Sequence, residues 1–283
     1  MKLVKTIEEM RAFRNAVRKN SKRLGLVPTM GALHEGHLSL VRAARDKSDI
    51  VAVSIFVNPT QFGPNEDFAK YPRNLESDSK MLEREHVDVI FAPSVDDMYP
   101  PGAMTWVTVE GISDRLCGKS RPGHFRGVTT IVSKLFHIIE PDAAFFGQKD
   151  AAQVAIIRRM VRDLNMPVEI EVGEIIRESD GLALSSRNAY LDPQERKSAL
   201  VLHRSLQDAQ RLFETGERNS EKLIAVGKQE FAGEPCARLD YFEIIDPDSL
   251  EPVTTIENRT LIAVAAFIGN TRLIDNIIVD PHS

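Results

Sequence analysis

Two histidines three positions apart, His34 and His37, have the residue type and the setting for chemistry on a phosphoryl group. They follow an apolar run at residues 24–27, which we predict to be a strand, and a turn that contains Gly31. A helix is expected from about residue 38 to residue 47, so both histidines stand at its start. The first N–H groups of a helix lack partners and carry partial positive charge, which attracts anions. Imidazoles at such a place can donate hydrogen bonds to charge that develops on a phosphoryl group, so the segment predicts nucleotide chemistry.

Two other interpretations of this segment are a zinc site and an ordinary surface turn. The His-Glu-x-x-His motif of zinc metalloproteases places its histidines four positions apart on one helix face. Here the spacing is one residue shorter, and Gly36 is a poor residue for a helix interior, so we do not expect zinc. A glycine-rich turn with surface histidines remains the plain alternative. The place directly after a predicted strand favours the functional interpretation.

Two side-chain amides, those of Asn58 and Gln61, follow the next predicted strand at residues 50–56. An amide offers donors and an acceptor, which suits a neutral or carboxylate-bearing substrate. In parallel α/β sheets ligands bind beyond the carboxyl ends of the strands, where the histidines also stand. A solvent-exposed loop is the alternative for an isolated amide pair.

Three further segments carry groups that bind phosphates. Residues 120–127 hold two arginines and another histidine ahead of a helical pattern. Residues 147–150 repeat the strand-to-helix arrangement and add Lys149. Residues 184–187 combine two serines with Arg187 in a polar turn, which suits a mobile clamp on phosphates. Taken singly each is more often a helix cap or a surface turn, but together with the histidines they indicate one ligand site.

Composition limits the cellular setting of the chain. Its 283 residues, 42% of them hydrophobic, suffice for one large or two small domains with a real core. No apolar run reaches the ~18–20 residues that a membrane span needs, and the charged N-terminal stretch does not resemble a signal peptide. Two isolated cysteines, Cys117 and Cys236, do not suggest a disulfide framework. We expect a cytoplasmic protein with no membrane partner.

The net charge of −5 and the pI near 5.9 disfavour binding to a nucleic-acid backbone, which depends on Lys and Arg. The basic clusters at residues 11–19 and 158–162 have helical spacing, and we interpret them as solvated helix faces. A small anionic ligand in a local pocket remains compatible with an acidic chain.

Residues 1–178 alternate apolar runs with helical patterns, which predicts an α/β fold with a Rossmann-like parallel sheet. The expected strands lie at residues 24–27, 50–56, 87–91, 143–146 and 168–172. Residues 128–136 have the clearest helical periodicity, and a further helix is expected over 151–164.

From about residue 179 the pattern changes, and residues 179–283 are expected to form a smaller α+β lid domain. Helices are predicted at residues 193–213 and 220–231, and strands at 239–245, 260–267 and 273–279.

Several motifs, in sequence order, give the chain a resemblance to a known family. The pair in His34-Glu35-Gly36-His37 is similar to the signature of the nucleotidyltransferase superfamily that includes class I aminoacyl-tRNA synthetases. At a finer level the chain resembles the pantothenate synthetase (pantoate–β-alanine ligase) family. The segments that carry this finer resemblance are Pro28-Thr29-Met30-Gly31, Phe56-Val57-Asn58-Pro59, Arg121-Pro122-Gly123-His124-Phe125-Arg126-Gly127 and Leu182-Ala183-Leu184-Ser185-Ser186-Arg187-Asn188.

The resemblance implies an ATP-dependent ligase that makes pantothenate, a coenzyme A precursor, from pantoate and β-alanine. Pantoate would first react with ATP to give pantoyl adenylate and pyrophosphate. The amine of β-alanine would then displace AMP. The resemblance also implies Mg²⁺ as a companion of ATP, and a homodimer.

The resemblance also implies roles for individual positions. His37 would be the first catalytic residue, aided by His34 and Lys149. Gln61 and Gln153 would bind pantoate, Gln61 also lying near β-alanine, and Asn58 and Arg121 would complete the substrate site. The ATP site would comprise Met30, Gly31, Ala32, Leu33, His34, Glu35, Gly36, His37, Gly147, Gln148, Lys149, Asp150, Ile176, Leu184, Ser185, Ser186 and Arg187. No residue is assigned to a metal.

One departure from the family pattern and three alternative functions remain. Ala151 and Ala152 stand where an aromatic residue and a glutamine would be expected before Gln153, so a contact from that pair would be missing. An adenylyltransferase acting on a phosphate acceptor would use the same histidines, but it would favour Arg or Lys in place of the amides. A tRNA-charging enzyme is disfavoured by the acidic pI and the small C-terminal domain. A nucleotide-binding regulator without turnover would not need the histidines.

Overall fold

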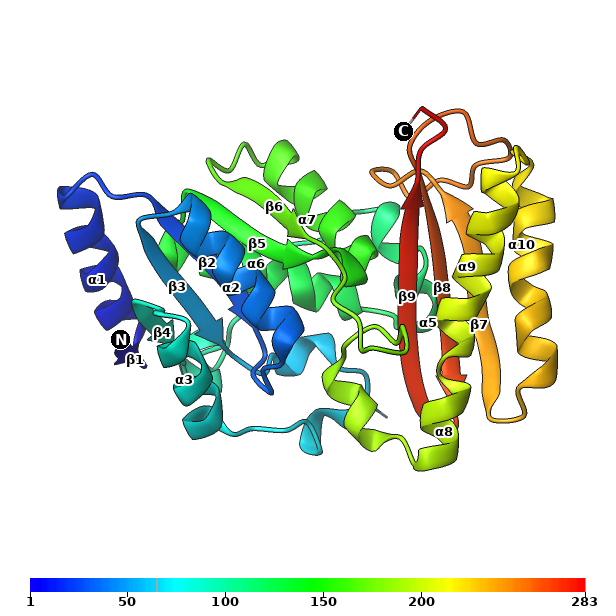
Figure 1. Ribbon diagram of the computed structural model, residues 1–283. Helices are drawn as coiled ribbons and strands as arrows, with labels where there is room; N and C mark the ends of the chain where they lie inside the picture. Colours follow the sequence, from blue (N-terminus) through cyan, green and yellow to red (C-terminus); the bar gives the residue numbers. More distant parts are fainter. Residues whose placement is uncertain (65, 283) are drawn as a thin grey trace. The chain divides into compact units, whose positions relative to one another are not determined.

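The computed structural model describes residues 1–64 and 66–282, and the chain folds into two compact units (Figure 1). The first unit comprises Met1–Gly147 and Ile156–Glu174, and the second comprises Gln148–Ala155 and Ile175–Ser283. The short segment Gln148–Ala155 therefore folds with the C-terminal part of the chain, although the sequence interpretation kept it with the first domain. The last crossing between the units, after Glu174, lies close to the boundary predicted after residue 178.

A six-stranded parallel sheet forms the centre of the first unit. Its strands stand in the order β1-β4-β3-β2-β5-β6. The predicted Rossmann-like α/β fold is confirmed, because neighbouring parallel strands need helical crossovers between them. The strands are β1 (Lys2–Val4), β2 (Leu24–Thr29), β3 (Ile50–Ile55), β4 (Val89–Phe91), β5 (Ala143–Gly147) and β6 (Glu169–Gly173).

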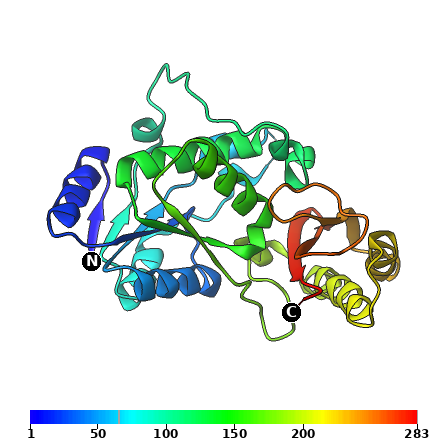
Figure 2. The ribbon, with the colours of Figure 1, turned by 90° about the horizontal axis from the view of Figure 1, so that it is seen from above.

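Helices cover both faces of this sheet, as right-handed crossovers require. The strands β2, β3 and β4 follow one another toward one edge of the sheet, and β5 and β6 follow one another toward the other edge. Accordingly α2 (Glu35–Lys47) and α3 (Leu75–Arg84) lie on one face, and α6 (His124–Ile139) lies on the other (Figure 2). α1 (Ile7–Lys19) packs against α6. The direction reverses between β2 and β5, and such switch points are where ligands bind in this class of fold.

The second unit is an antiparallel sheet, β7 (Ala237–Ile245), β8 (Thr260–Ile268) and β9 (Thr271–Val279), in that order. Figure 1 shows α9 (Val201–Glu214) and α10 (Ser220–Gln229) beside these strands. Apolar residues of both helices and of all three strands share one core. α10 approaches β7 closely, because a Cβ on Gly227 would lie 2.3 Å from the ring of Phe242. The predicted α+β character is confirmed.

Several element bounds differ from the prediction for physical reasons. Strand β1 was not predicted, because it has three residues and only Val4 is buried. The helix predicted over residues 193–213 is broken into α8 (Pro193–Ser198) and α9. α2 begins earlier than expected because His34 caps it. α7 spans Ala151–Asp163, and the short helices α4 and α5 span Val95–Met98 and Cys117–Ser120.

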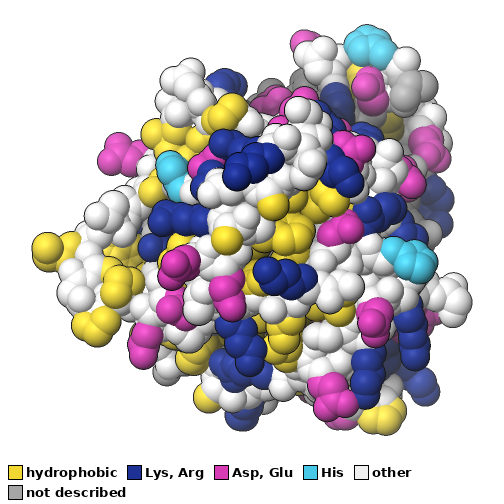
Figure 3. All heavy atoms as spheres, turned by 90° about the vertical axis from the view of Figure 1, so that its left-hand side faces the viewer, with side chains coloured by type: hydrophobic (Ala, Val, Ile, Leu, Met, Phe, Trp, Pro, Cys, Tyr) yellow, Lys and Arg dark blue, Asp and Glu magenta, His cyan; other side chains and the backbone are white. Residues whose placement is uncertain are grey.

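Charges of both signs are interspersed on the face that Figure 3 shows. On α1 the guanidinium groups of Arg14 and Arg18 both pair with Glu140. The Arg18 side chain is 59% exposed, as expected for a solvated face, but that of Arg14 is only 12% exposed, so the interpretation of residues 11–19 as a solvated face is wrong for Arg14. Among the residues that the structure describes, no helix is long and apolar enough to cross a membrane.

Candidate active site

The two histidines cap helix α2 reciprocally. The His34 ring accepts the backbone N–H of Gly36 on Nδ1 at 3.2 Å, and the His37 ring accepts the N–H of His34 on Nδ1 at 3.3 Å. This is the capping-box arrangement, which Ser or Thr and Glu usually make, built here from two imidazoles. The ring centroids lie 4.1 Å apart. One local interaction therefore both begins the helix and orients both rings.

The caps also determine where the neutral rings carry their protons. A neutral imidazole has one accepting and one donating nitrogen. Because Nδ1 of His34 and of His37 accepts from the backbone, each neutral ring carries its proton on Nε2. Protonation of Nδ1 would remove the cap. Both rings are thus prepared as Nε2–H donors at a helix N-terminus, which is suited to a phosphoryl oxygen.

A buried carboxylate supports the turn that leads to the histidines. Asp78 on α3 is 3% exposed and accepts the N–H groups of Ala32, at 3.1 Å, and Leu33, at 2.9 Å. Gly31 adopts its φ of +79° without strain, but the φ of +51° at Ala32 is strained for a residue with a Cβ and needs such support. Burial raises the pKa of Asp78, and the two N–H donors offset part of that rise. Asp78 was not among the predicted residues, because a single acidic residue in a helical pattern gives no sign of burial.

The amide loop is linked to the histidine turn. Asn58 is 1% exposed, and its Nδ2 donates to Gln61 Oε1 at 3.0 Å and to the Gly127 carbonyl at 3.1 Å. Its Oδ1 accepts from the hydroxyl of Tyr99 at 2.9 Å. Gln61 Nε2 donates to the Met30 sulfur at 3.0 Å. Since Asn58 is occupied on both sides, its contacts orient Gln61 rather than present an amide to solvent.

Arg121 and His124 hold the other side of the same loop. Arg121 donates to both carboxylate oxygens of Glu66, at 2.7 and 2.6 Å. An arginine can only donate, so at 3.1 Å His124 Nε2 accepts from Arg121, and Nδ1–H donates to the Gln61 carbonyl at 2.8 Å. Burial raises the pKa of Glu66, but the Arg121 guanidinium, together with a backbone hydrogen bond at Gly63 and His124, outweighs burial and holds that pKa below its ordinary value. This ion pair fixes the backbone at Gln61.

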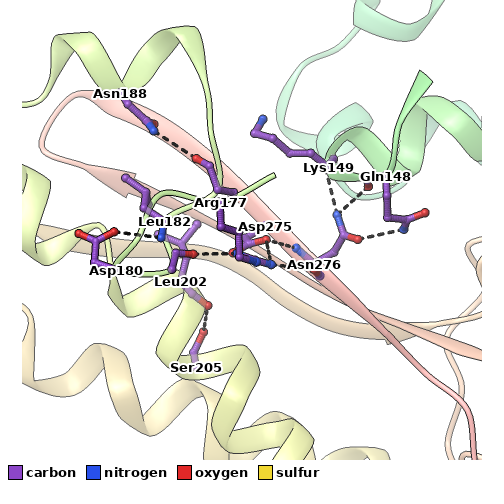
Figure 4. A network of polar contacts seen from close by, with 12 residues as sticks. Gln148, Lys149, Arg177, Asp180, Leu182, Asn188, Leu202, Ser205, Asp275 and Asn276 are labelled. Atoms are coloured by element: carbon purple, nitrogen blue, oxygen red, sulfur yellow. Dashed lines mark hydrogen bonds and ion pairs between the residues drawn. The ribbon is translucent and has the colours of Figure 1, made fainter. Parts of the chain in front are cut away.

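Apart from Gly147, the remaining candidates lie in the second unit, in two segments, and Figure 4 shows Gln148 and Lys149 of the first of them. Gln148–Asp150 is a 3₁₀ turn, and its residues Gln148 and Lys149 contact Asn276 on β9. Ile176 and Leu184 face each other across a tight hairpin, with the Leu184 N–H donating to the Ile176 carbonyl at 3.0 Å. The Ser185 hydroxyl accepts the N–H of Arg187 at 3.3 Å and caps the next 3₁₀ turn.

The structure thus sorts the predicted residues into two groups. Met30–His37 in the turn, together with Asn58, Gln61 and Arg121, belong to the first unit, where hydrogen bonds connect Asn58, Gln61 and Met30. Gly147 ends β5 in the same unit. The second unit holds the predicted residues Gln148, Lys149, Asp150, Gln153, Ile176, Leu184, Ser185, Ser186 and Arg187. The predicted residues are therefore divided between the two units.

Comparisons with known proteins agree over nearly the whole chain. The family model described as pantoate–β-alanine ligase matches residues 2–278. A pantothenate synthetase of Koribacter versatilis is 59% identical over 279 residues, which is 99% of this chain and 96% of the relative. One of Thermotoga petrophila is 56% identical over 279 residues, 99% of this chain and 100% of the relative.

Solved structures give the same result. The pantothenate synthetase of Thermus thermophilus superposes with a TM-score of 0.94 at 44% identity, covering 99% of this chain and 100% of that one. A pantoate–β-alanine ligase from Francisella tularensis, complexed with β-γ ATP and β-alanine, superposes with a TM-score of 0.81 at 37% identity. This alignment covers 98% of the present chain and 97% of the Francisella chain.

Proposed function

The chain belongs to the pantoate–β-alanine ligase family, and we propose that it makes pantothenate through a pantoyl-adenylate intermediate formed from ATP. In the first step a pantoate carboxylate oxygen bonds to the α-phosphorus of ATP. The bond from that phosphorus to the bridging oxygen breaks, and pyrophosphate leaves. In the second step the neutral amine of β-alanine bonds to the activated carbonyl carbon. The carbon–oxygen bond to AMP breaks, and the amine loses a proton to water.

The observation that carries this proposal is the reciprocal cap of His34 and His37. It holds two Nε2–H donors at a helix N-terminus before any ligand arrives. Negative charge that grows on the α-phosphoryl oxygens would meet donors that need no reorganisation, and this is the largest contribution in many enzymes. We assign His37 the first catalytic role and His34 the second, with Lys149 neutralising charge on the phosphates.

We assign the pantoate site to Gln61 and Gln153. The Gln61 side chain is held between Asn58 and Met30, so its amide is oriented before pantoate binds. An oriented amide suits a substrate with hydroxyl and carboxylate groups, and Gln61 would also lie near β-alanine. Asn58 and Arg121 would act through Gln61, because their contacts hold its side chain and its backbone. This set of amides does not suit a phosphate acceptor, which speaks against the adenylyltransferase alternative.

We assign the nucleotide to residues 30–37 in the first unit and to Gly147, residues 148–150, Ile176 and residues 184–187. Mg²⁺ would accompany the triphosphate, because this ion is usually held by phosphate oxygens with one or two carboxylates. Asp150, whose side chain is exposed next to Lys149, fits that donor type. The ion would neutralise charge on the departing pyrophosphate.

We also propose that the enzyme works in the cytoplasm as a homodimer, which the family resemblance supports. Light scattering coupled to gel filtration tests the oligomeric state. A mass of about one chain at micromolar concentration would refute the dimer.

Isotope exchange between pyrophosphate and ATP, with β-alanine absent, tests the reaction. Exchange that requires pantoate is expected, because adenylate formation is reversible. Exchange without pantoate would point to another acceptor. The absence of exchange and of AMP release with all substrates present would refute the proposal and favour a regulator.

A further inference from the structure

The side chain of Asn276 uses both of its N–H donors and its carbonyl oxygen on one of the two predicted nucleotide-binding segments, residues 148–150. It is 3% exposed, and its Nδ2 donates to the carbonyls of Gln148 and Lys149, each at 3.0 Å. Its Oδ1 accepts from Gln148 Nε2, also at 3.0 Å. In Figure 4 the Lys149 side chain extends away from Asn276, so Asn276 holds the backbone of Lys149 from behind.

The preceding residue, Asp275, holds the hairpin that leads into the other predicted nucleotide-binding segment, residues 184–187. It is 3% exposed and binds the Arg177 guanidinium at 2.6 and 2.9 Å. Arg177 lies in the hairpin between Ile176 and Leu184, where it bridges to Ala183 and donates to the Gly181 carbonyl at 3.0 Å. The arginine therefore connects both sides of this hairpin to β9.

Strand β9 gives these two residues a fixed base. Asp275 and Asn276 stand opposite Val264 and Ala263 of β8, whose residues around the pair are buried. The N–H of Asn276 also donates to Asp275 Oδ1 at 2.8 Å, which joins the two side-chain networks. A pair of neighbouring residues on one core strand thus contacts two segments that are far apart in the sequence.

We propose that Asp275 and Asn276 are positioning residues that hold Lys149 and the 184–187 segment in one frame, so that both meet ATP in a fixed geometry. The inference rests on the proposed function, because it takes these segments to be the ATP site of the second unit. Neither residue needs to touch ATP. A displacement of about 1 Å in groups that contact a reacting centre can reduce the rate about 10²-fold.

The test compares Asn276→Ala and the isosteric Asn276→Asp with wild type and with a matched control, Thr260→Val. Thr260 lies in the same sheet, is 2% exposed, and donates from its hydroxyl to the Asn258 carbonyl at 2.8 Å. The control therefore deletes a comparably buried hydrogen bond that touches neither nucleotide segment. If Asn276→Ala fails to fold, Asn276→Ser takes its place.

Three measurements decide the result: ATP affinity by calorimetry, pantoate-dependent pyrophosphate–ATP exchange, and the single-turnover rate of β-alanine with enzyme-bound pantoyl adenylate. We expect the Asn276 variants to bind ATP at least about 10-fold more weakly and to exchange about 10- to 100-fold more slowly. The β-alanine step should stay within about threefold of wild type, because the pyrophosphate has already left. Thr260→Val should match wild type in all three.

The outcomes separate the inference from the proposed function. Unchanged ATP affinity in well-folded Asn276 variants would overturn the inference, as would equal slowing of both half-reactions, which indicates general damage. If wild-type enzyme binds ATP but shows no pantoate-dependent exchange, the proposed function is overturned. The ATP affinities of the Asn276 variants then still test the inference. Wild type that does not bind ATP would overturn both.

Discussion

The histidine turn of the first unit and the nucleotide segments of the second unit are held in place in different ways. His34 and His37 orient each other within a single helical turn, and Asp78 adds support from the next helix. Lys149 and the hairpin at Arg177 depend on Asn276 and Asp275, which lie about a hundred or more positions later in the chain. The residues of both regions could be predicted from the sequence, but the distant contacts that support the second become visible only in the fold.

The largest expected effect comes from removing the buried charge that supports the second unit. Asp275→Asn deprives the Arg177 guanidinium of its counter-ion. The Asp275 side chain is 2% exposed, so the pair is buried on its carboxylate side. Removal of one partner from a buried ion pair costs about 3–5 kcal/mol. Denaturant unfolding should therefore show a clear loss of stability. A loss below about 1 kcal/mol would show that the second unit does not depend on this distant contact.

The local cap can be separated from the catalytic donor by two substitutions of His37. Asn resembles the Nδ1 side of the ring and should keep the cap, while it lacks the Nε2–H donor. His37→Asn is expected to fold normally and to lose about 10²- to 10³-fold in pyrophosphate–ATP exchange. His37→Ala, which can make neither the cap nor the donor contact, should in addition lose stability at the start of α2, by about 1 kcal/mol.

Circular dichroism melting and exchange kinetics check this pair. Equal activity of His37→Asn and wild type would remove the donor role. Equal stability of both variants would show that the reciprocal cap contributes nothing.

A smaller effect is expected for Asp78→Asn, which tests how far the turn needs its neighbouring helix. The amide can accept one of the two N–H groups of Ala32 and Leu33 and turns a second donor toward the other. The loss of one buried hydrogen bond costs about 1–3 kcal/mol, and exchange should slow with it.

The pH dependence of the same variant has a definite sign. Because the folded pKa of Asp78 is raised, the folded state binds more protons than the unfolded state between the ordinary and the raised pKa. The contribution of Asp78 to stability therefore falls as the pH rises through that window. Asp78→Asn should remove this fall in stability. Urea unfolding from pH 3 to 7 checks this, and a variant that still loses stability as wild type does over the window would contradict the prediction.

The smallest effect is expected for a local contact in the second unit. The Glu217 carboxylate accepts the N–H groups of Arg218 and Asn219 and pairs with Lys222 at 2.7 Å. The Lys222 ammonium group and these N–H groups lower the pKa of Glu217 to about 2. Its stabilising contribution is present above the ordinary pKa and is lost as the pH falls through about 2.

Glu217→Gln should leave ATP affinity and turnover unchanged at pH 7, and NMR titration of the wild-type carboxyl should find the low pKa. A change in ATP affinity would mean that local contacts in the second unit also control its nucleotide segments, which would contradict their dependence on distant contacts alone.

Periodicity and residue type predicted much of the first unit. The strands after which His34 and Gln61 stand are continuous apolar runs, and such runs report burial on both faces of a parallel sheet. The glycine turn could be predicted from residue type and the existence of the following helix from its apolar pattern, whereas the cap that fixes its first residue was not predicted. The prediction placed the start of α2 three residues late, since histidine is not among the usual capping residues.

The supports of the site could not be predicted in the same way. Asp78 and Asn276 each stand in patterns that fit an exposed polar residue as well as a buried one. Their burial depends on which elements pack together, and that is a property of the fold rather than of neighbouring residues. The grouping of residues 148–155 with the second unit was missed for the same reason, because its cause includes the contact with β9.

The reciprocal cap has a consequence for how the chain can change over generations. Loss of His34 would remove the acceptor that orients the start of α2, and loss of His37 would release the N–H that holds His34. Replacement of either imidazole by a side chain that cannot accept a backbone N–H thus also disturbs the other ring. Selection for turnover therefore acts on the two histidines together.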